Sequence, residues 1–283
     1  MRAEDVAKVA VGPSKWRGGS EDFSPWTKLM TDIVTGDAFG VDRIDYLLRD
    51  SLHAGVGYGR FDHYRLIDTL RVLPGAADRP VIGIERGGIH AAEALQQARY
   101  FMFTQLYLHR VRRAYDKHLV DFLSAWLPGH KYPINIASHL ALMDNEVLSA
   151  IHKAAAAPGL PGHDAARRIV CRQHFRVLYE SRAEDLQKTL HPEAAIYAAA
   201  AAEFGPEDVR LDTYRQGSQP VEFAVLREDG QVVSSLQESE ILNHIPRAAV
   251  AYVFVVPERR AEADKWLKSN QESILTKAFE EKI

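Results

Sequence analysis

The chain has 283 residues, enough for one large domain or two smaller ones, and 46% of them are hydrophobic, which is sufficient for a substantial core. Its 35 Lys and Arg residues nearly balance its 38 Asp and Glu residues, which disfavours a nucleic-acid-binding protein that depends on bulk positive charge. The single cysteine, Cys171, excludes an internal disulfide framework and a CxxC zinc ribbon. We therefore expect a soluble, cytoplasmic protein without a membrane segment or signal peptide.

The first two thirds of the chain carry apolar residues at helical spacing and predict helices joined by short breaks that contain Gly or Pro. Residues 89–126 contain neither Gly nor Pro and predict one long helix, whereas residues 81–88 predict a short strand and turn. The expected helices cover residues 4–11, 26–34, 41–52, 61–73, 89–126, 141–156 and 164–180.

The chain beyond Gly205 has a different character, because it is rich in β-branched and aromatic residues. Strands are predicted at residues 209–214, 221–226, 232–236 and 250–256, and helices at 237–245 and 258–279. The Asp229-Gly230 pair between the second and third strands is typical of a hairpin turn. We predict a mainly α fold, with a helical domain at residues 1–180 and a small α+β module at residues 181–283.

Residues 41–55, VDRIDYLLRDSLHAG, place polar side chains along one face of a predicted helix. At about 100° per residue, four of these side chains fall within an arc of about 80°. The four are Asp42, Tyr46, Asp50 and His53, flanked by Arg43 and Arg49, and the opposite face carries Ile44, Leu47, Leu48 and Leu52. Carboxylates and an imidazole suit a divalent metal, and a phenol with a guanidinium suits phosphate. A solvated helix face explains the same pattern without any ligand.

The motif VDRIDYLLRDSLHAGVGYG, followed by FDHYRLI, closely resembles the C-terminal half of the catalytic domain of HD-domain metal-dependent phosphohydrolases. The subgroup it resembles is the dNTP triphosphohydrolases, which includes dGTPase-like and SAM-and-HD-domain-like enzymes. Residues 82–118, residues 142–147 and the β-rich tail extend the resemblance over roughly residues 25–260. The resemblance implies an HD-domain-like helical bundle followed by a small α+β module.

The resemblance also implies roles for residues of the motif. Asp42 corresponds to the last metal-ligand aspartate of the family and is therefore the expected catalytic and metal-binding residue. Arg43 corresponds to a residue that contacts substrate phosphate. Tyr46 corresponds to a tyrosine that packs on the phosphates or sugar, and Asp50 to a carboxylate that binds a sugar hydroxyl. We expect His53 to join them in binding substrate.

Two residues of the long predicted helix are further substrate-binding candidates by resemblance. His109 aligns with a family histidine near the substrate pocket, and Tyr115 resembles a family tyrosine near the sugar. The neighbouring basic residues Arg112, Arg113 and Lys117 fit either a phosphate-facing patch or a solvated helix face. Family members use a divalent metal (Mn, Mg, Fe, Zn or Ni) to activate a water that attacks the α-phosphorus, which releases a deoxynucleoside and intact triphosphate.

The family completes its metal site with an upstream histidine and a His-Asp pair, but no histidine precedes His53 in this chain. One aspartate cannot hold a catalytic metal at useful affinity. The pair His163-Asp164 follows the motif and lacks a partner histidine at a suitable offset, so we predict a loop and helix cap there.

Three interpretations remain open. The chain is a truncated or split phosphohydrolase, a subunit that donates Asp42 and its neighbours to a chain carrying the missing His…His-Asp half, or a non-catalytic nucleotide-binding or regulatory module. The expected partners are a deoxynucleotide and either further copies of the chain, in a homo-oligomer, or the complementing chain. We expect neither a membrane nor a nucleic acid as a partner.

Overall fold

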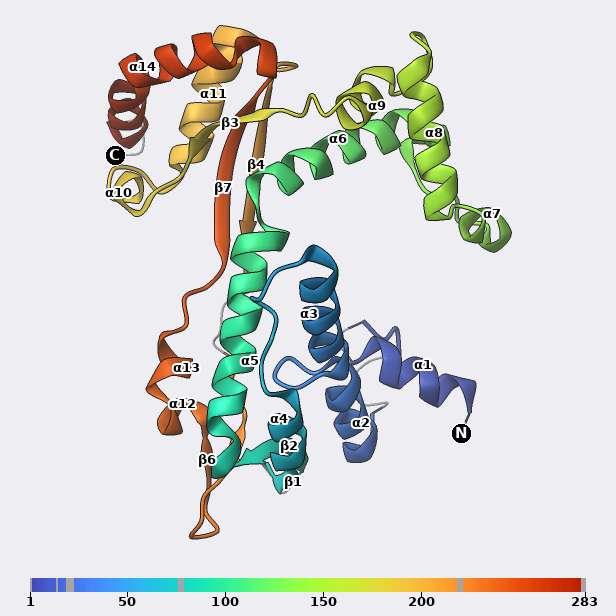
Figure 1. Cartoon of the computed structure of the whole chain (residues 1–283), viewed down its shortest axis with the longest axis vertical. Coiled ribbons are helices and arrows are strands. Elements are labelled where there is room, and N and C mark those ends of the chain that lie inside the picture. The colour runs from blue at the N-terminus through green and yellow to red at the C-terminus, as the bar shows by residue number, and fades with distance from the viewer. Residues whose placement is uncertain (1, 14, 19–22, 76–78, 218–220, 281–283) are drawn as a thin grey trace. The chain divides into compact units, whose positions relative to one another are not determined.

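The computed structural model describes residues 2–13, 15–18, 23–75, 79–217 and 221–280. The chain folds into two compact units, which are treated separately below (Figure 1). Unit 1 comprises Met1–Leu106 and Gln216–Ala248, and unit 2 comprises Tyr107–Arg215 and Ala249–Ile283. Most described residues lie in helices, and each unit also contains a small sheet, in agreement with the predicted mainly α fold with β-rich segments.

Unit 1 combines helices with a four-stranded sheet in the order β1-β2-β5-β6. Its helices are α1 (Ala3–Val11), α2 (Pro25–Thr35), α3 (Val41–Ala54), α4 (His63–Thr69), α5 (Ile89–Met102), α12 (Ser235–Glu238) and α13 (Glu240–His244). Its strands are β1 (Leu70–Pro74), β2 (Pro80–Glu85), β5 (Ala224–Leu226) and β6 (Val232–Ser234). Strand β2 pairs antiparallel with β1 and parallel with β5, and β5 and β6 form the predicted hairpin.

Helix α3 is fixed in unit 1 by one buried face. Ile44, Leu47 and Ser51 recur at helical spacing and are at most 9% exposed. The helix ends at Gly55, whose φ of 68° is a left-handed conformation that glycine adopts without steric cost. Leu52, which the pattern places on the face opposite the polar residues, is 67% exposed and is not part of this buried face. The polar face of α3 is thereby held away from the core.

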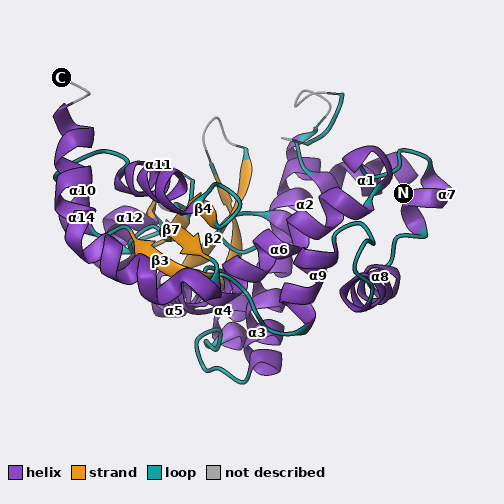
Figure 2. Ribbon diagram, turned by 90° about the horizontal axis from the view of Figure 1, so that it is seen from above, coloured by secondary structure: helices purple, strands orange, loops and turns teal. Residues whose placement is uncertain are grey.

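Unit 2 contains a three-stranded antiparallel sheet in the order β3-β7-β4. Its strands are β3 (Arg176–Glu180), β4 (Val209–Arg215) and β7 (Ala249–Val255). Its helices are α6 (Arg110–Trp126), α7 (Ile136–Leu140), α8 (Asp144–Ala156), α9 (His163–Val170), α10 (Ala183–Leu186), α11 (Pro192–Phe204) and α14 (Arg260–Glu280). Helices α11 and α14 pack beside the sheet (Figure 2), where Ile196, Phe254 and Leu275 are almost fully buried.

Three predicted helices are shorter in the structure. The stretch 89–126 is interrupted by a π-helical turn at Phe103–Tyr107 and an extended residue at His109. The stretch 164–180 is helical only in α9 and then forms β3, which pairs with β7. The stretch 61–73 likewise gives a short helix followed by β1. In the second stretch, pairing with the distant strand β7 overrides the local helical pattern, and in the third, pairing of β1 with the following strand β2 does so.

The two units do not coincide with the predicted ranges 1–180 and 181–283. The segment containing β5 and β6 follows β4 in the chain but pairs with β2, so it belongs to unit 1. Within the described residues, every helix is too short or too polar to cross a membrane.

Candidate functional site

The polar face of α3 carries the residues singled out by the motif. Asp42, Tyr46, Asp50 and His53 all lie on this one continuous helix, as predicted. Asp42 and His53 are exposed, and Tyr46 and Asp50 are half-buried. The face therefore presents carboxylates, a phenol and an imidazole to the surface of unit 1.

Asp42 lies in the first turn of α3, where a negative charge is favoured by the helix dipole. Its Oδ1 accepts a hydrogen bond from the backbone N–H of Arg43 at 2.7 Å. The preceding Gly40 allows this arrangement, because a Cβ there would approach the Gly36 carbonyl oxygen to 2.7 Å and Asp42 Oδ1 to 2.8 Å. The Asp42 carboxylate is thus positioned by its own backbone and remains at the surface.

Arg43 turns back toward the loop that precedes its helix. Its Nε donates to the Gly36 carbonyl at 2.9 Å, and its Nη2 contacts Asp37 Oδ1 at 2.5 Å. The Arg43 side chain is 19% exposed and that of Asp37 is 82% exposed. A phosphate that binds Arg43 must compete with the solvated carboxylate of Asp37. The motif did not reveal this ion pair, because Asp37 lies before it in the chain. The sequence feature that could have pointed to Asp37 is its position directly after Gly36, where α2 ends.

His53 is oriented by a bond within its own helix. Its Nδ1 lies 2.8 Å from the carbonyl oxygen of Arg49, which can only accept a hydrogen bond. The Nδ1 atom therefore carries the proton, and Nε2 of the neutral ring is the acceptor. An exposed imidazole with this tautomer can accept a hydrogen bond from a hydroxyl group or bind a metal ion.

The described residues do not form a complete metal site. None of their His, Cys, Asp and Glu side chains come together in a group of three or more that could hold an ion. Asp42 alone does not fit a divalent metal, which needs several ligands of matched geometry. Binding of the expected metal thus requires ligands in addition to the side chains of the described residues.

The other two predicted substrate residues belong to unit 2. His109 is exposed and caps the N-terminus of α6, where its Nδ1 accepts a hydrogen bond from the Val111 N–H at 3.4 Å. Tyr115 is half-buried, and its ring lies 4.8 Å from that of His174. Both residues have structural roles inside unit 2.

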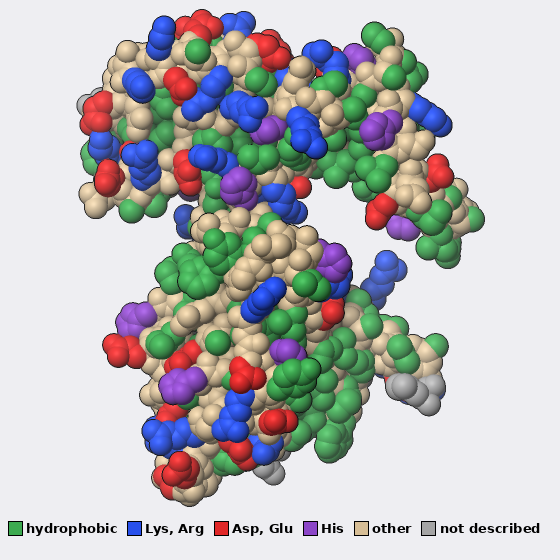
Figure 3. All heavy atoms as spheres, viewed as in Figure 1, with side chains coloured by type: hydrophobic (Ala, Val, Ile, Leu, Met, Phe, Trp, Pro, Cys, Tyr) green, Lys and Arg blue, Asp and Glu red, His purple; other side chains and the backbone are tan. Residues whose placement is uncertain are grey.

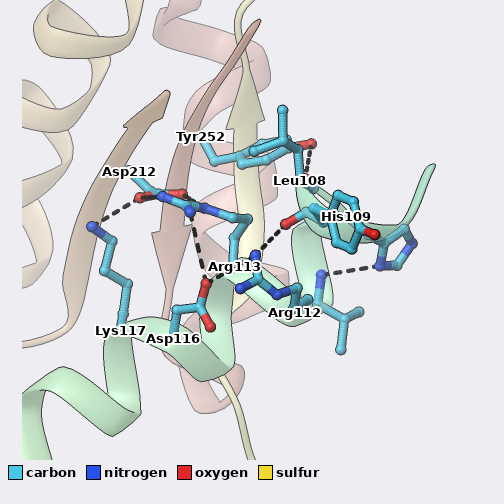
Figure 4. Close-up of polar contacts among 10 residues, drawn as sticks. Leu108, His109, Arg112, Arg113, Asp116, Lys117, Asp212 and Tyr252 are labelled. Atoms are coloured by element: carbon cyan, nitrogen blue, oxygen red, sulfur yellow. Dashed lines mark hydrogen bonds and ion pairs between the residues drawn. The ribbon is translucent and has the colours of Figure 1, made fainter. Parts of the chain in front are cut away.

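The basic residues near His109 are neither a free phosphate patch nor a purely solvated face. Arg113 makes two hydrogen bonds of 2.6 Å to Asp212, and Lys117 lies 2.8 Å from the same carboxylate (Figure 4). Asp212 is 1% exposed. Burial alone would raise the pKa of Asp212, but hydrogen bonds from Arg113 and Lys117 outweigh it and hold that pKa below its ordinary value.

The pair His163-Asp164 forms local structure, although Asp164 is not the cap itself. Gly162 occupies the cap position of α9, and Asp164 lies in the first turn. His163 Nδ1 lies 2.8 Å from the Ala154 carbonyl oxygen. This histidine therefore ties α9 to α8.

Comparison with known proteins gives a family and several relatives. Residues 61–260 match the family described as the HD associated region. YwfO, an uncharacterized protein of Bacillus subtilis, is 28% identical in an alignment of 232 positions that covers 72% of this chain and 52% of YwfO. The uncharacterized protein MJ1154 of Methanocaldococcus jannaschii is 39% identical over 84 residues, which are 30% of this chain and 18% of that protein.

Two solved structures share the fold. A hypothetical protein from Aquifex aeolicus has a TM-score of 0.75 and 27% identity, over 93% of this chain and 64% of the Aquifex chain. A phosphohydrolase from Bacteroides thetaiotaomicron has a TM-score of 0.61 and 22% identity, over 83% of this chain and 64% of that one. The chain thus spans about half the length of YwfO and less than two thirds of both solved chains. Because the family match extends over more than half of the sequence, the chain belongs to the family of the HD associated region.

Proposed function

We propose that the chain is part of a metal-dependent phosphohydrolase of the HD superfamily that hydrolyses deoxynucleoside triphosphates to a deoxynucleoside and triphosphate. The observation that carries this proposal is the match of residues 61–260 to the HD associated region. The phosphohydrolase from Bacteroides with the same fold supports it, as does the polar face of α3.

In this proposal the polar face of α3 is one wall of the substrate site. Asp42 is one metal ligand, and Arg43 binds a substrate phosphate after exchanging its ion pair with Asp37. Tyr46 packs on the phosphates or sugar, and Asp50 and His53 bind sugar hydroxyls. By the same resemblance, His109 and Tyr115 of unit 2 are proposed as substrate-binding residues.

The remaining metal ligands come from outside the described residues, because these offer no group of three candidate ligands. We propose that a segment or a second chain with an upstream histidine and a His-Asp pair completes the site. The proposed partners are therefore a second chain that carries the histidine and the His-Asp pair, or further copies of this chain.

Nucleotide binding tests the proposal without a complete metal site. Each of the four dNTPs is titrated calorimetrically into the purified chain, with and without Mn²⁺. We expect at least one to bind, and we expect Arg43→Gln to weaken that binding roughly tenfold, because a charge-assisted hydrogen bond to phosphate is lost.

Arg71→Gln is the matched control, since Arg71 is also in unit 1, also pairs with a carboxylate (Glu85, 2.7 Å) and also donates to backbone carbonyls. The proposal predicts unchanged affinity for this variant. Absence of dNTP binding, or equal affinity of the wild type and Arg43→Gln, would contradict it. Binding that depends on Arg43 but is unaffected by both Mn²⁺ and Asp42→Ala would favour a regulatory nucleotide-binding module.

A further inference from the structure

A cavity in unit 2 lies where three basic segments meet. It is about 280 Å³ in volume. Three of the segments that line it are basic: the start of α6, the segment leading into β3 and the start of α14. The end of β7 contributes an apolar residue. Its lining residues are Arg110, Val111, His174, Phe175, Arg176, Val177, Phe254 and Arg260. None of these residues belongs to the polar face of α3.

The cavity is strongly positive. The described residues that line it include three arginines and no carboxylate. Within the described part of the chain, Arg110 and Arg176 form no ion pair, whereas Arg260 pairs with Asp264 one turn further along α14. Figure 3 shows Lys and Arg side chains gathered over the part of unit 2 that contains α14 and β3. An anion in the cavity would relieve the repulsion among these charges.

Two long helices begin at the cavity. Arg110 is the first residue of α6 and Arg260 is the first residue of α14, which have 17 and 21 residues. The N-terminus of a helix carries a partial positive charge, although the Arg260 N–H is already paired with the Pro257 carbonyl of the 3-10 turn that precedes α14. Both helix ends therefore add to the positive potential that the arginines create.

His174 is a buried imidazole that contacts Arg176 at the same place. It is 7% exposed, and its Nε2 lies 3.0 Å from Nη1 of Arg176. A guanidinium cannot accept a hydrogen bond, so Nε2 accepts and Nδ1 carries the proton. This Nδ1 has no hydrogen bond of normal geometry to the described residues.

The neutral form of His174 is consistent with its surroundings. Burial and the charge of Arg176 lower its pKa, and the Arg172 carbonyl offsets only part of this lowering.

We propose that this cavity binds a phosphate group. Arg110, Arg176 and Arg260 would neutralise its charge, and His174 would hold the guanidinium of Arg176 in place through the hydrogen bond that its Nε2 accepts. The cavity is at the small end of the range of sites for drug-sized ligands, which favours inorganic phosphate or a short polyphosphate over a ligand buried as a whole nucleotide.

The test is calorimetric titration of the full chain with inorganic phosphate, tripolyphosphate and dGTP, each at 0.15 M salt to suppress non-specific attraction. We expect phosphate or tripolyphosphate to bind, and we expect Arg110→Gln and Arg176→Gln each to weaken binding at least tenfold. Arg167→Gln is the control, because Arg167 is an exposed arginine of α9 that does not line the cavity. This variant should bind as the wild type does.

The histidine gives an independent readout. In nitrogen NMR spectra, the Nε2 signal of His174, which accepts a hydrogen bond from Arg176, should shift on addition of tripolyphosphate, and the shift should be absent in Arg176→Gln. Binding of dGTP alone, with the same dependence on Arg110 and Arg176, would also support a phosphate site, one that takes its phosphate as part of a nucleotide. Absence of binding by all three probes, or binding that Arg110→Gln and Arg176→Gln leave unchanged, would overturn the proposal.

Discussion

On α3, Asp42 and His53 are exposed, whereas in unit 2 Asp212 is 1% exposed and receives hydrogen bonds from Arg113 and Lys117. The two sites use the same kinds of side chain in opposite surroundings. Removal of a buried carboxylate that is fully paired destabilises the fold, because its partners are left uncompensated, and such a carboxylate has no capacity for a ligand. An exposed carboxylate contributes little to stability and is free to serve a function. The comparison predicts that substitutions in unit 2 change folding, whereas those on α3 change binding.

The largest effect on stability is expected for Asp212→Asn. The substitution places a buried neutral amide where Arg113 and Lys117 both pair with a carboxylate, which should lower the free energy of unfolding by about 3 kcal/mol. Urea denaturation at pH 7 measures it. If Asp212→Asn changes the free energy of unfolding by less than about 1 kcal/mol, buried Asp212 contributes no more to stability than an exposed carboxylate of α3 does, and the proposed difference between the two sites is wrong.

The same carboxylate should show a pH dependence at low pH. Its pKa in the folded state is below the ordinary value of 3.8, so its contribution is complete above that value and is lost as the pH falls through the folded-state pKa. The difference in stability between the wild type and Asp212→Asn should therefore shrink below about pH 4. A difference that is constant from pH 7 to pH 3 would contradict this assignment.

The next largest effect is a pH dependence of stability that arises from His118 in α6. This side chain is 1% exposed and accepts a hydrogen bond from the Phe175 N–H at 3.1 Å. Burial lowers the pKa of His118 to about 4, and the charge of Arg168 adds to this. Since the unfolded chain binds the proton more readily between about pH 6.5 and pH 4, stability should fall by about 2 kcal/mol from pH 7 to pH 5.

His118→Gln should flatten this slope in urea denaturation series at several pH values. His174 should leave a remainder, because its pKa is also lowered. An unchanged slope in the variant would show that His118 titrates normally.

A smaller effect is expected for Tyr179→Phe. The Tyr179 hydroxyl donates to Asp185 at 2.7 Å, and both side chains are at most 6% exposed. Burial and this hydrogen bond raise the pKa of Tyr179 above its ordinary value. Removal of the hydroxyl should cost about 1 kcal/mol at neutral pH, as measured by thermal or urea unfolding. Equal stability of the two proteins would argue against this bond.

The smallest effect should be that of Asp45→Asn on α3. Asp45 pairs with Arg49 at 2.8 Å, but both side chains are more than half exposed. The change in unfolding free energy should stay within about 0.5 kcal/mol. A loss comparable with that of Asp212→Asn would show that exposure does not separate the two regions.

Local patterns predicted much of the fold. The bounds of α3 follow from its apolar spacing and from Gly55, and the β5–β6 hairpin follows from Asp229-Gly230. The interruption near His109 could not be predicted, because no Gly or Pro marks it. Leu108 there is 2% exposed, and its carbonyl oxygen accepts a hydrogen bond from Tyr252, which is distant in sequence.

For the candidate sites too, local patterns predict what lies on one helix but not the contacts between residues that are distant in sequence. The motif located the polar face of α3, since all its members lie on one helix. The partnership of Arg113 with Asp212 and the cavity around Arg176 join residues that are far apart in the chain, so no local pattern reveals them. Both depend on the pairing of β3 and β4 with β7.

The most direct test of the central claim is release of intact triphosphate from dNTPs with Mn²⁺, measured by ion chromatography. The wild-type chain is co-expressed with the half that carries the His and His-Asp ligands and compared with Asp42→Asn in the same complex. The proposal predicts a loss of roughly 100-fold or more for Asp42→Asn. Asp68→Asn, an exposed carboxylate on α4, should be unaffected. Equal release by Asp42→Asn and the wild type, or no release by the complex, would contradict the assignment of the α3 face to the active site.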